Sequence, residues 1–147
     1  MRYAIATMLT AGLLAVPASA ADLDPGLLVL RSTDVPAGFV LDREDTGVRT
    51  NEAEAGANRK TRALIARLGR VTGYEAEWDR DRDLEVIHSR ADVFRTTAGA
   101  RMLLNEYATG FRTAGIKGLR RTAVRIGDEG HVYHGGADSR LTWVSWR

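Results

Sequence analysis

Hydrophobic residues along the chain follow two periods, and the change between them is clearest from residue 84 to 115. The run from Leu84 to Phe94 is rich in apolar and β-branched side chains, which favours a buried strand. Thr96 or Thr97 can cap a following helix, because a side-chain hydroxyl accepts a hydrogen bond from a free backbone N–H. Apolar residues then recur at helical spacing on one stripe: Ala100, Leu103, Leu104, Tyr107 and Phe111. We therefore predict a strand leading into an amphipathic helix that ends near Gly115.

The remaining elements are shorter, and glycine, proline and aspartate mark their limits. The run 79–83 alternates aspartate with arginine and is expected to form the tip of a hairpin. Asn51 is expected to begin a helix that ends at Gly69. We predict helices at 25–30 and 51–68, and strands at 39–41, 74–78, 120–126, 131–134 and 140–146.

This order of elements predicts an α+β fold. We expect an antiparallel sheet of five to six strands with two main helices packed on one face. The middle six elements follow the order βαββαβ, which is compatible with a ferredoxin-like core. Residues 21–147 are expected to form a single domain, since their number suits one hydrophobic core.

The first twenty residues have the pattern of a secretory signal peptide. Arg2 precedes an apolar run, and Ala18-Ser19-Ala20 supplies the small side chains that a signal peptidase accepts. We expect cleavage after Ala20 and a secreted or periplasmic location. The apolar run is shorter than the about 20 residues that span a bilayer, so no stable membrane insertion is expected after signal removal.

Composition narrows the possible functions. The chain has no cysteine, which excludes disulfides and thiol chemistry. Its 21 basic and 19 acidic residues give a net charge of +2, too small a basic excess to predict nucleic-acid binding. The glycines near 110–118 do not have the spacing of a phosphate-binding loop. We expect the chain to bind no cofactor.

Three histidines offer a possible metal site. His131 and His134 are close in sequence, and His88 of another strand could join one of them across the sheet. In a strand, however, residues three apart point to opposite faces, which disfavours the pair as ligands. The aspartates of 79–83 lack the glycine and the final glutamate of a calcium-binding loop, so calcium is not predicted there.

Five aromatic residues fall in predicted strands and form the best candidate for a binding surface. With nearby arginines they could hold a ring-bearing or anionic ligand, although such residues more often form the core between sheet and helices. These residues are Tyr74, Trp78, Tyr133, Trp143 and Trp146. Glu75 and Glu77 share one strand face, as an acid–base pair would, but the alternation also suits a solvent-facing surface. No catalytic residue is assigned.

Several short motifs resemble a group of uncharacterised exported proteins and lipoproteins of actinobacteria and their relatives. They are Asp34-Val35-Pro36-Ala37-Gly38-Phe39, Gly69-Arg70-Val71-Thr72-Gly73-Tyr74, Val93-Phe94-Arg95 with Ala98-Gly99-Ala100, and Ile126-Gly127-Asp128-Glu129-Gly130 before a closing Trp-Arg. The chain is also loosely similar to the extracellular sensor domains of mycobacterial serine/threonine kinases. It departs from these groups in lacking the lipobox cysteine and the disulfides. The resemblance implies a fold rather than an activity.

Together these features favour a non-catalytic binding role over catalysis. The expected partner is a small ligand, a cell-envelope component or an envelope protein. One alternative is a metal-assisted hydrolase that uses these three histidines with the nearby carboxylates of Asp128, Glu129 and Asp138. Another is a structural envelope protein that pairs through its last strand.

Overall fold

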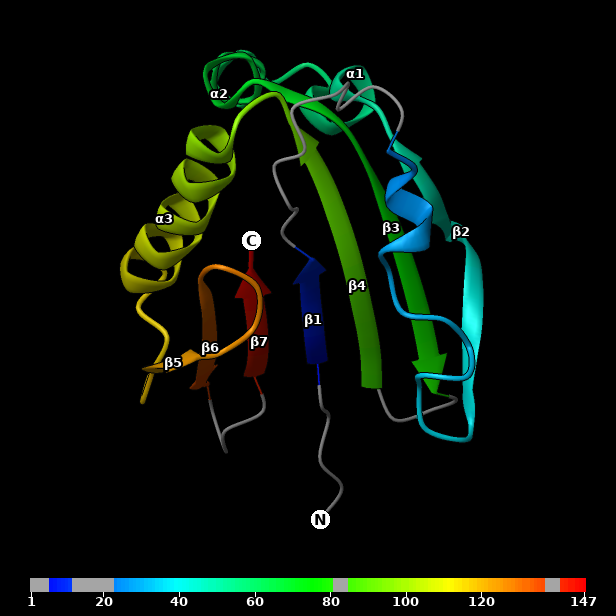
Figure 1. Ribbon diagram of the computed structural model, residues 1–147. Helices are drawn as coiled ribbons and strands as arrows, with labels where there is room; N and C mark the ends of the chain where they lie inside the picture. The colour runs from blue at the N-terminus through cyan, green and yellow to red at the C-terminus, as the bar shows by residue number, and fades with distance from the viewer. Residues whose placement is uncertain (1–5, 12–22, 81–84, 137–140) are drawn as a thin grey trace.

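The computed structural model describes residues 6–11, 23–80, 85–136 and 141–147. Seven strands, three α-helices and one 3-10 turn follow one another along the chain, which confirms the α+β class (Figure 1). In order they are β1 (Ala6–Ala11), η2 (Pro25–Leu27), β2 (Phe39–Arg49), α1 (Asn51–Ala55), α2 (Arg59–Leu68), β3 (Arg70–Arg80), β4 (Glu85–Phe94), α3 (Thr97–Thr113), β5 (Arg120–Val124), β6 (Gly130–Gly135) and β7 (Leu141–Trp146).

The strands form one sheet in the order β2-β3-β4-β1-β7-β6-β5. Strands β2, β3 and β4 pair antiparallel, as do β5, β6 and β7, in agreement with the expected antiparallel hairpins. In a ferredoxin-like core, β2 would be the first strand and β4 the third, and these two would lie side by side. Here β2 pairs with β3 and lies at the edge of the sheet, so the ferredoxin-like core is not confirmed.

Strand β1 lies in the middle of the sheet, although it belongs to the segment predicted to be a signal peptide. It pairs in parallel with β4 on one side and with β7 on the other (Figure 1). As a result β7 is an interior strand, and β2 and β5 are the edges. Within the described residues, no helix has both the length and the apolar character needed to cross a bilayer.

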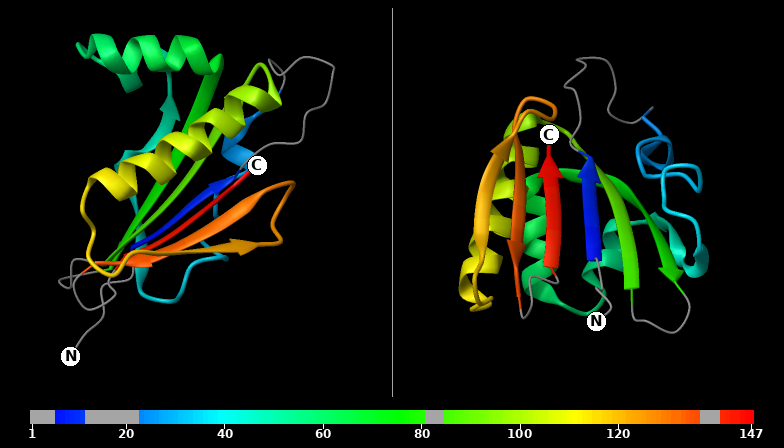
Figure 2. Two further views of the ribbon diagram at one scale, coloured as in Figure 1. Left: turned by 90° about the vertical axis from the view of Figure 1, so that its left-hand side faces the viewer. Right: turned by 90° about the horizontal axis from the view of Figure 1, so that it is seen from below.

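The two faces of the sheet are covered by different segments. Helix α3 lies on one face and α2 packs against it, as Figure 2 shows. The opposite face of β3 and β4 is covered by η2 and the segment after it, where the Leu30 amide donates to Ser89 Oγ at 2.9 Å. The core on this second face consists of Val29, Ala76, Trp78, Ile87 and Ala91, against which Leu30, Val35, Phe39 and Tyr74 pack. Each strand therefore presents alternate residues to two different layers.

Side-chain caps explain where the helices begin and end. The Thr96 hydroxyl accepts from the Gly99 amide at 3.1 Å, as expected for the start of α3. The predicted helix 51–68 is instead two helices, because Gly56 has a positive φ of 47° and Asn58 caps a new helix. Thr50 rather than Asn51 caps α1, and Gly69 ends α2 in the left-handed conformation.

Candidate functional site

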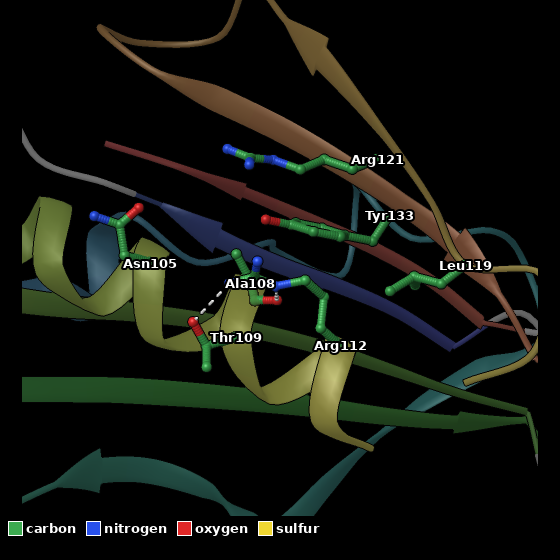
Figure 3. A pocket seen from close by; sticks show the side chains of 7 residues that line it. All are labelled: Asn105, Ala108, Thr109, Arg112, Leu119, Arg121 and Tyr133. Atoms are coloured by element: carbon green, nitrogen blue, oxygen red, sulfur yellow. Dashed lines mark hydrogen bonds between the residues drawn. The ribbon is translucent and has the colours of Figure 1, made fainter. Parts of the chain in front are cut away.

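A cavity of about 390 Å³ lies between α3 and the hairpin of β5 and β6. Such a volume falls within the range of small-molecule sites, about 300–1,000 Å³. Figure 3 shows the lining side chains: four come from α3, one lies just before β5, one comes from β5 and one from β6. They are Asn105, Ala108, Thr109, Arg112, Leu119, Arg121 and Tyr133.

Tyr133 forms one wall of this cavity. Its side chain is 1 % exposed, and the Phe111 ring packs against it with 5.0 Å between ring centroids. Its hydroxyl is buried and has no hydrogen-bond partner among the described residues. A tyrosine hydroxyl is protonated at neutral pH and able to donate, and burial raises the pKa of Tyr133 further from neutrality. A buried hydroxyl without a partner costs about 1–3 kcal/mol, so an acceptor that reached it would stabilise the folded chain.

Two arginines place positive charge beside the hydroxyl. The Arg121 guanidinium carbon lies 6.0 Å from the centroid of the Tyr133 ring, and the two side chains extend side by side in Figure 3. Arg121 also contacts the Nε2 atom of His131 at 2.6 Å. Arg112 donates to the Ala108 carbonyl at 3.2 Å and to the Thr109 hydroxyl at 3.1 Å. In the part of the chain that the structure describes, these partners of Arg112 and Arg121 are a carbonyl, a hydroxyl and an imidazole, and none is a carboxylate.

A second cavity, of about 310 Å³, lies between α1 and α2 and is also lined by arginines. The buried one, Arg70, is already bound: its Nε lies 2.7 Å from Asp92, its Nη1 lies 2.7 Å from Asn51 Oδ1, and its Nη2 lies 2.9 Å from the Arg49 carbonyl. These contacts satisfy Arg70, and Arg62 at the same cavity donates to the Gly56 carbonyl at 2.8 Å.

A cluster of carboxylates and one histidine occupies the helix-facing side of β3 and β4. Glu77 pairs with His88 across the two strands, and Glu75 pairs with Arg90. The His88 Nδ1 atom lies 3.0 Å from Glu77 Oε2 and 3.4 Å from Glu75 Oε1. We call Glu75, Glu77 and His88 the carboxylate–histidine cluster. It overturns the interpretation of Glu75 and Glu77 as a solvent-facing surface, because their side chains are only 13 % and 15 % exposed.

Charges within the cluster shift its pKa values. The hydrogen bond to His88 lowers the pKa of Glu75, with help from Arg90 and Arg49, against the effect of burial. The same hydrogen bond raises the pKa of His88. Burial raises the pKa of Glu77, and the neighbouring carboxylates of Asp45, Asp79 and Glu75 act in the same direction. Glu77 is therefore the carboxylate of the cluster with the least favourable surroundings for its charge.

The five aromatic residues of the predicted binding surface do not share one face. Tyr74 and Trp78 belong to the core under η2, whereas Tyr133 faces α3. Only the backbone of Trp143 and Trp146 is described, in β7, and their side chains lie outside the described part of the structure. Of the predicted aromatic set, Tyr133 alone lines the cavity at α3.

The three predicted metal-binding histidines also lie apart. His88 is on β4, while His131 and His134 are on β6, with β1 and β7 between the two strands. His131 faces the Tyr133 ring, with 6.3 Å between centroids, and its Nε2 lies 3.4 Å from Glu129. His134 is exposed and its Nδ1 lies 3.2 Å from the Thr142 hydroxyl. The partners of His88 are Glu75 and Glu77 of β3, rather than the other two histidines.

Two arginines that line the α3 cavity were not singled out from the sequence. Arg112 and Arg121 are ordinary members of an arginine-rich chain, and no local pattern distinguishes them. The available signal was weak: Arg121 is in a predicted strand, and Arg112 lies one residue beyond the apolar stripe of α3. Comparisons of the chain with protein-family models, with curated proteins and with solved structures found no match. The structure itself shows an α+β domain with a cavity that two arginines line.

Proposed function

We propose that this chain is a non-catalytic binding protein whose α3 cavity holds a small anionic ligand with a flat apolar part. The single observation that carries the proposal is the buried Tyr133 hydroxyl, which has no partner among the described residues and lines a cavity flanked by two arginines. A carboxylate or phosphate would accept from Tyr133, Arg112 and Arg121. The apolar part would occupy the space between Ala108 and Leu119.

Charge and shape both support an anion over a neutral or cationic ligand. The polar groups at the cavity are mostly donors, and two of them are positively charged. Carboxylates and phosphates match a guanidinium through paired hydrogen bonds, whereas a ligand cation would be repelled. The Leu119 and Ala108 side chains add apolar contact, which makes a bare inorganic anion a weaker match than an aromatic one.

Calorimetric titration of the full chain with phenyl phosphate, benzoate and benzyl alcohol tests this proposal. We expect the two anions to bind and the neutral alcohol to bind at least tenfold more weakly.

The substitution Tyr133→Phe keeps the ring and removes only the donor. It should weaken the binding of both anions about 10- to 100-fold, as expected when a hydrogen bond to a charged group is lost. The same substitution should leave folding stability unchanged or slightly higher, because it removes an unsatisfied buried hydroxyl.

A matched pair of arginine substitutions separates the cavity from general electrostatic attraction. Arg121 and Arg120 are neighbours on β5, but their side chains point to opposite faces of the strand. Arg121→Gln should strongly weaken the binding of phenyl phosphate. Arg120→Gln makes the same change of charge and should leave the affinity for phenyl phosphate nearly unchanged. Equal weakening by both substitutions, or equal affinity for benzyl alcohol, would contradict the proposal.

We also propose that the protein is exported and acts outside the cytoplasm. The basic start, the apolar run and the Ala18-Ser19-Ala20 end of the leader support this, and so does the resemblance to exported actinobacterial proteins. Cleavage after Ala20 would remove β1 and leave the facing edges of β4 and β7 without their partner. N-terminal sequencing of the chain exported by a bacterial host should give Ala21 as the first residue. A recovered chain that still begins at Met1 would contradict the leader.

The two other functions considered from the sequence have less support. A hydrolase that uses His88 with His131 or His134 would need residues that lie on strands separated by two others. Pairing through the last strand would need a free edge on β7, and β7 has one only when β1 is absent. The second of these functions therefore depends on cleavage of the leader.

A further inference from the structure

A separate group of side chains, away from the α3 cavity, has the composition of a metal site. Glu75 and Glu77 come from β3 and His88 from β4, and one ligand atom of each lies within 4.8 Å of the others. Asp42, Asp45 and Glu77 form a second group with the same spacing, so Glu77 belongs to both. Strand β2 brings these aspartates close, since its pairing with β3 shifts register between Asp42 and Gly47.

The spacing of the ligand atoms suits a small cation. Ligand bonds of about 2.0–2.1 Å in tetrahedral geometry place neighbouring ligand atoms about 3.3–3.4 Å apart. The His88 Nδ1 atom lies 3.4 Å from Glu75 Oε1 and 3.0 Å from Glu77 Oε2. Because Glu75 and Glu77 are two residues apart on one strand, they share a face and can meet His88 without a change in backbone.

The local charges leave a deficit of positive charge. Four carboxylates meet here, those of Asp42, Asp45, Glu75 and Glu77. The described residues supply two guanidiniums: Arg49 lies 3.4 Å from Glu75 and 3.9 Å from Asp45, and Arg90 lies 3.6 Å from Glu75. The carboxylates therefore outnumber the guanidiniums here, and a divalent cation would reduce this surplus of negative charge.

The distribution of the arginines shows where that surplus lies. Arg90 is shared with Glu54 at 2.9 Å and with Asp92 at 3.0 Å, so it does not belong to Glu75 alone. Within the residues that the structure describes, Glu77 and Asp42 form no ion pair with arginine or lysine. Asp42 instead accepts from the amides of Glu44 and Asp45 through Oδ1.

We propose that Glu75, Glu77 and His88 bind one Zn²⁺ ion per chain, with Asp42 and Asp45 adding negative charge beside it. The imidazole favours zinc over calcium or magnesium, which take oxygen ligands. Three protein ligands leave a fourth position open to water or to a further ligand. The ion would join β3 to β4 on the helix-facing side, and through Asp42 and Asp45 it would hold the irregular part of β2 against them. This site is independent of the ligand cavity.

Calorimetric titration of the full chain with zinc chloride at pH 7.5, after removal of metal with EDTA, tests the site. We expect one zinc ion per chain, with calcium and magnesium binding at least tenfold more weakly. Glu77→Gln and His88→Gln should each lower the affinity for zinc by at least tenfold, which is the lower limit for changes around a bound metal. His134→Gln is the matched control, since His134 is exposed on the far strand β6, and it should leave zinc binding unchanged.

Three results would overturn the proposal. The first is no zinc binding by the unaltered chain. The second is zinc binding that survives both Glu77→Gln and His88→Gln, or that His134→Gln abolishes. The third is calcium binding tighter than zinc and unaffected by His88→Gln, which would assign a cation to the oxygen ligands of Asp42, Asp45 and Glu77 instead. Thermal unfolding of each variant in EDTA shows whether it is folded. If one variant is unfolded, the other still decides the outcome.

Discussion

Asp92→Asn will destabilise the folded chain by about 3–5 kcal/mol, the usual cost of removing one partner from a buried ion pair. Asp92 is 2 % exposed and Arg70 is 4 % exposed, and the Asp92 Oδ1 atom lies 2.7 Å from Arg70 Nε. The substitution keeps the shape of the side chain but removes its charge. Arg70 would then keep its guanidinium in the interior with neutral partners only, among them Asn51 and the Arg49 carbonyl, and Arg90 would lose its contact with the Asp92 charge as well.

Urea unfolding of the unaltered chain and of Asp92→Asn measures this loss of stability directly. A double variant separates the cost of an unpaired charge from the worth of the pair: Arg70→Met combined with Asp92→Asn removes the stranded cation as well. We expect the double variant to be more stable than Asp92→Asn alone, since the interior then holds no uncompensated guanidinium. A loss below about 1 kcal/mol in Asp92→Asn, or a double variant that is less stable still, would show that the pair does not carry this energy.

Gly99→Ala will also destabilise the chain, although helix propensity predicts a gain of up to about 1 kcal/mol. A Cβ at Gly99 would lie 2.0 Å from the Leu68 carbonyl oxygen, a backbone atom at the end of α2 that cannot move aside alone. Helix α3 would have to shift away from α2, and such overpacking costs about 1–3 kcal/mol or more. Gly99 is thus required by the close approach of two helices.

Gly110→Ala is the matched control for this prediction because Gly110 lies in the same helix. A Cβ there would meet nothing within 4 Å, so only helix propensity remains. We expect Gly110→Ala to stabilise the chain by about 0.5–1 kcal/mol, the reverse of Gly99→Ala. Thermal unfolding of both variants tests the pair of signs. Stabilisation by both substitutions would mean that α3 does not pack against Leu68 as described.

The comparison of these two glycines shows how far local patterns reach. In the sequence both appear as glycines within or at the start of one amphipathic helix, and neither is distinguished from the other. The packing of α3 against α2 makes one indispensable and leaves the other free. The charged residues of β3 and β4 show the same limit, since alternation placed Glu75 and Glu77 on one face but could not show that His88 and two arginines share it.

Local sequence patterns gave correct predictions at several positions where one segment settles its own structure. Thr96 at the start of α3, Gly69 at the end of α2 and the alternating strands β3 and β4 follow from caps and periods within a few residues. Gly56 and Asn58 carried the signal that divides the predicted helix 51–68, because a glycine followed by a capping residue ends one helix and starts another. That division was therefore available from the sequence.

The α+β class, most of the helices and strands, the absence of thiols and the expected leader all follow from local patterns of residues. The order of strands, the position of β1 between β4 and β7, the buried pair of Arg70 with Asp92, the cavity at Tyr133 and the cluster around His88 arise only in the folded chain. The difference lies in the distance along the chain over which each interaction acts. Capping and periodicity act over a few residues, whereas strand pairing and buried charge bring together residues far apart in the chain, and their free energies depend on every partner at once.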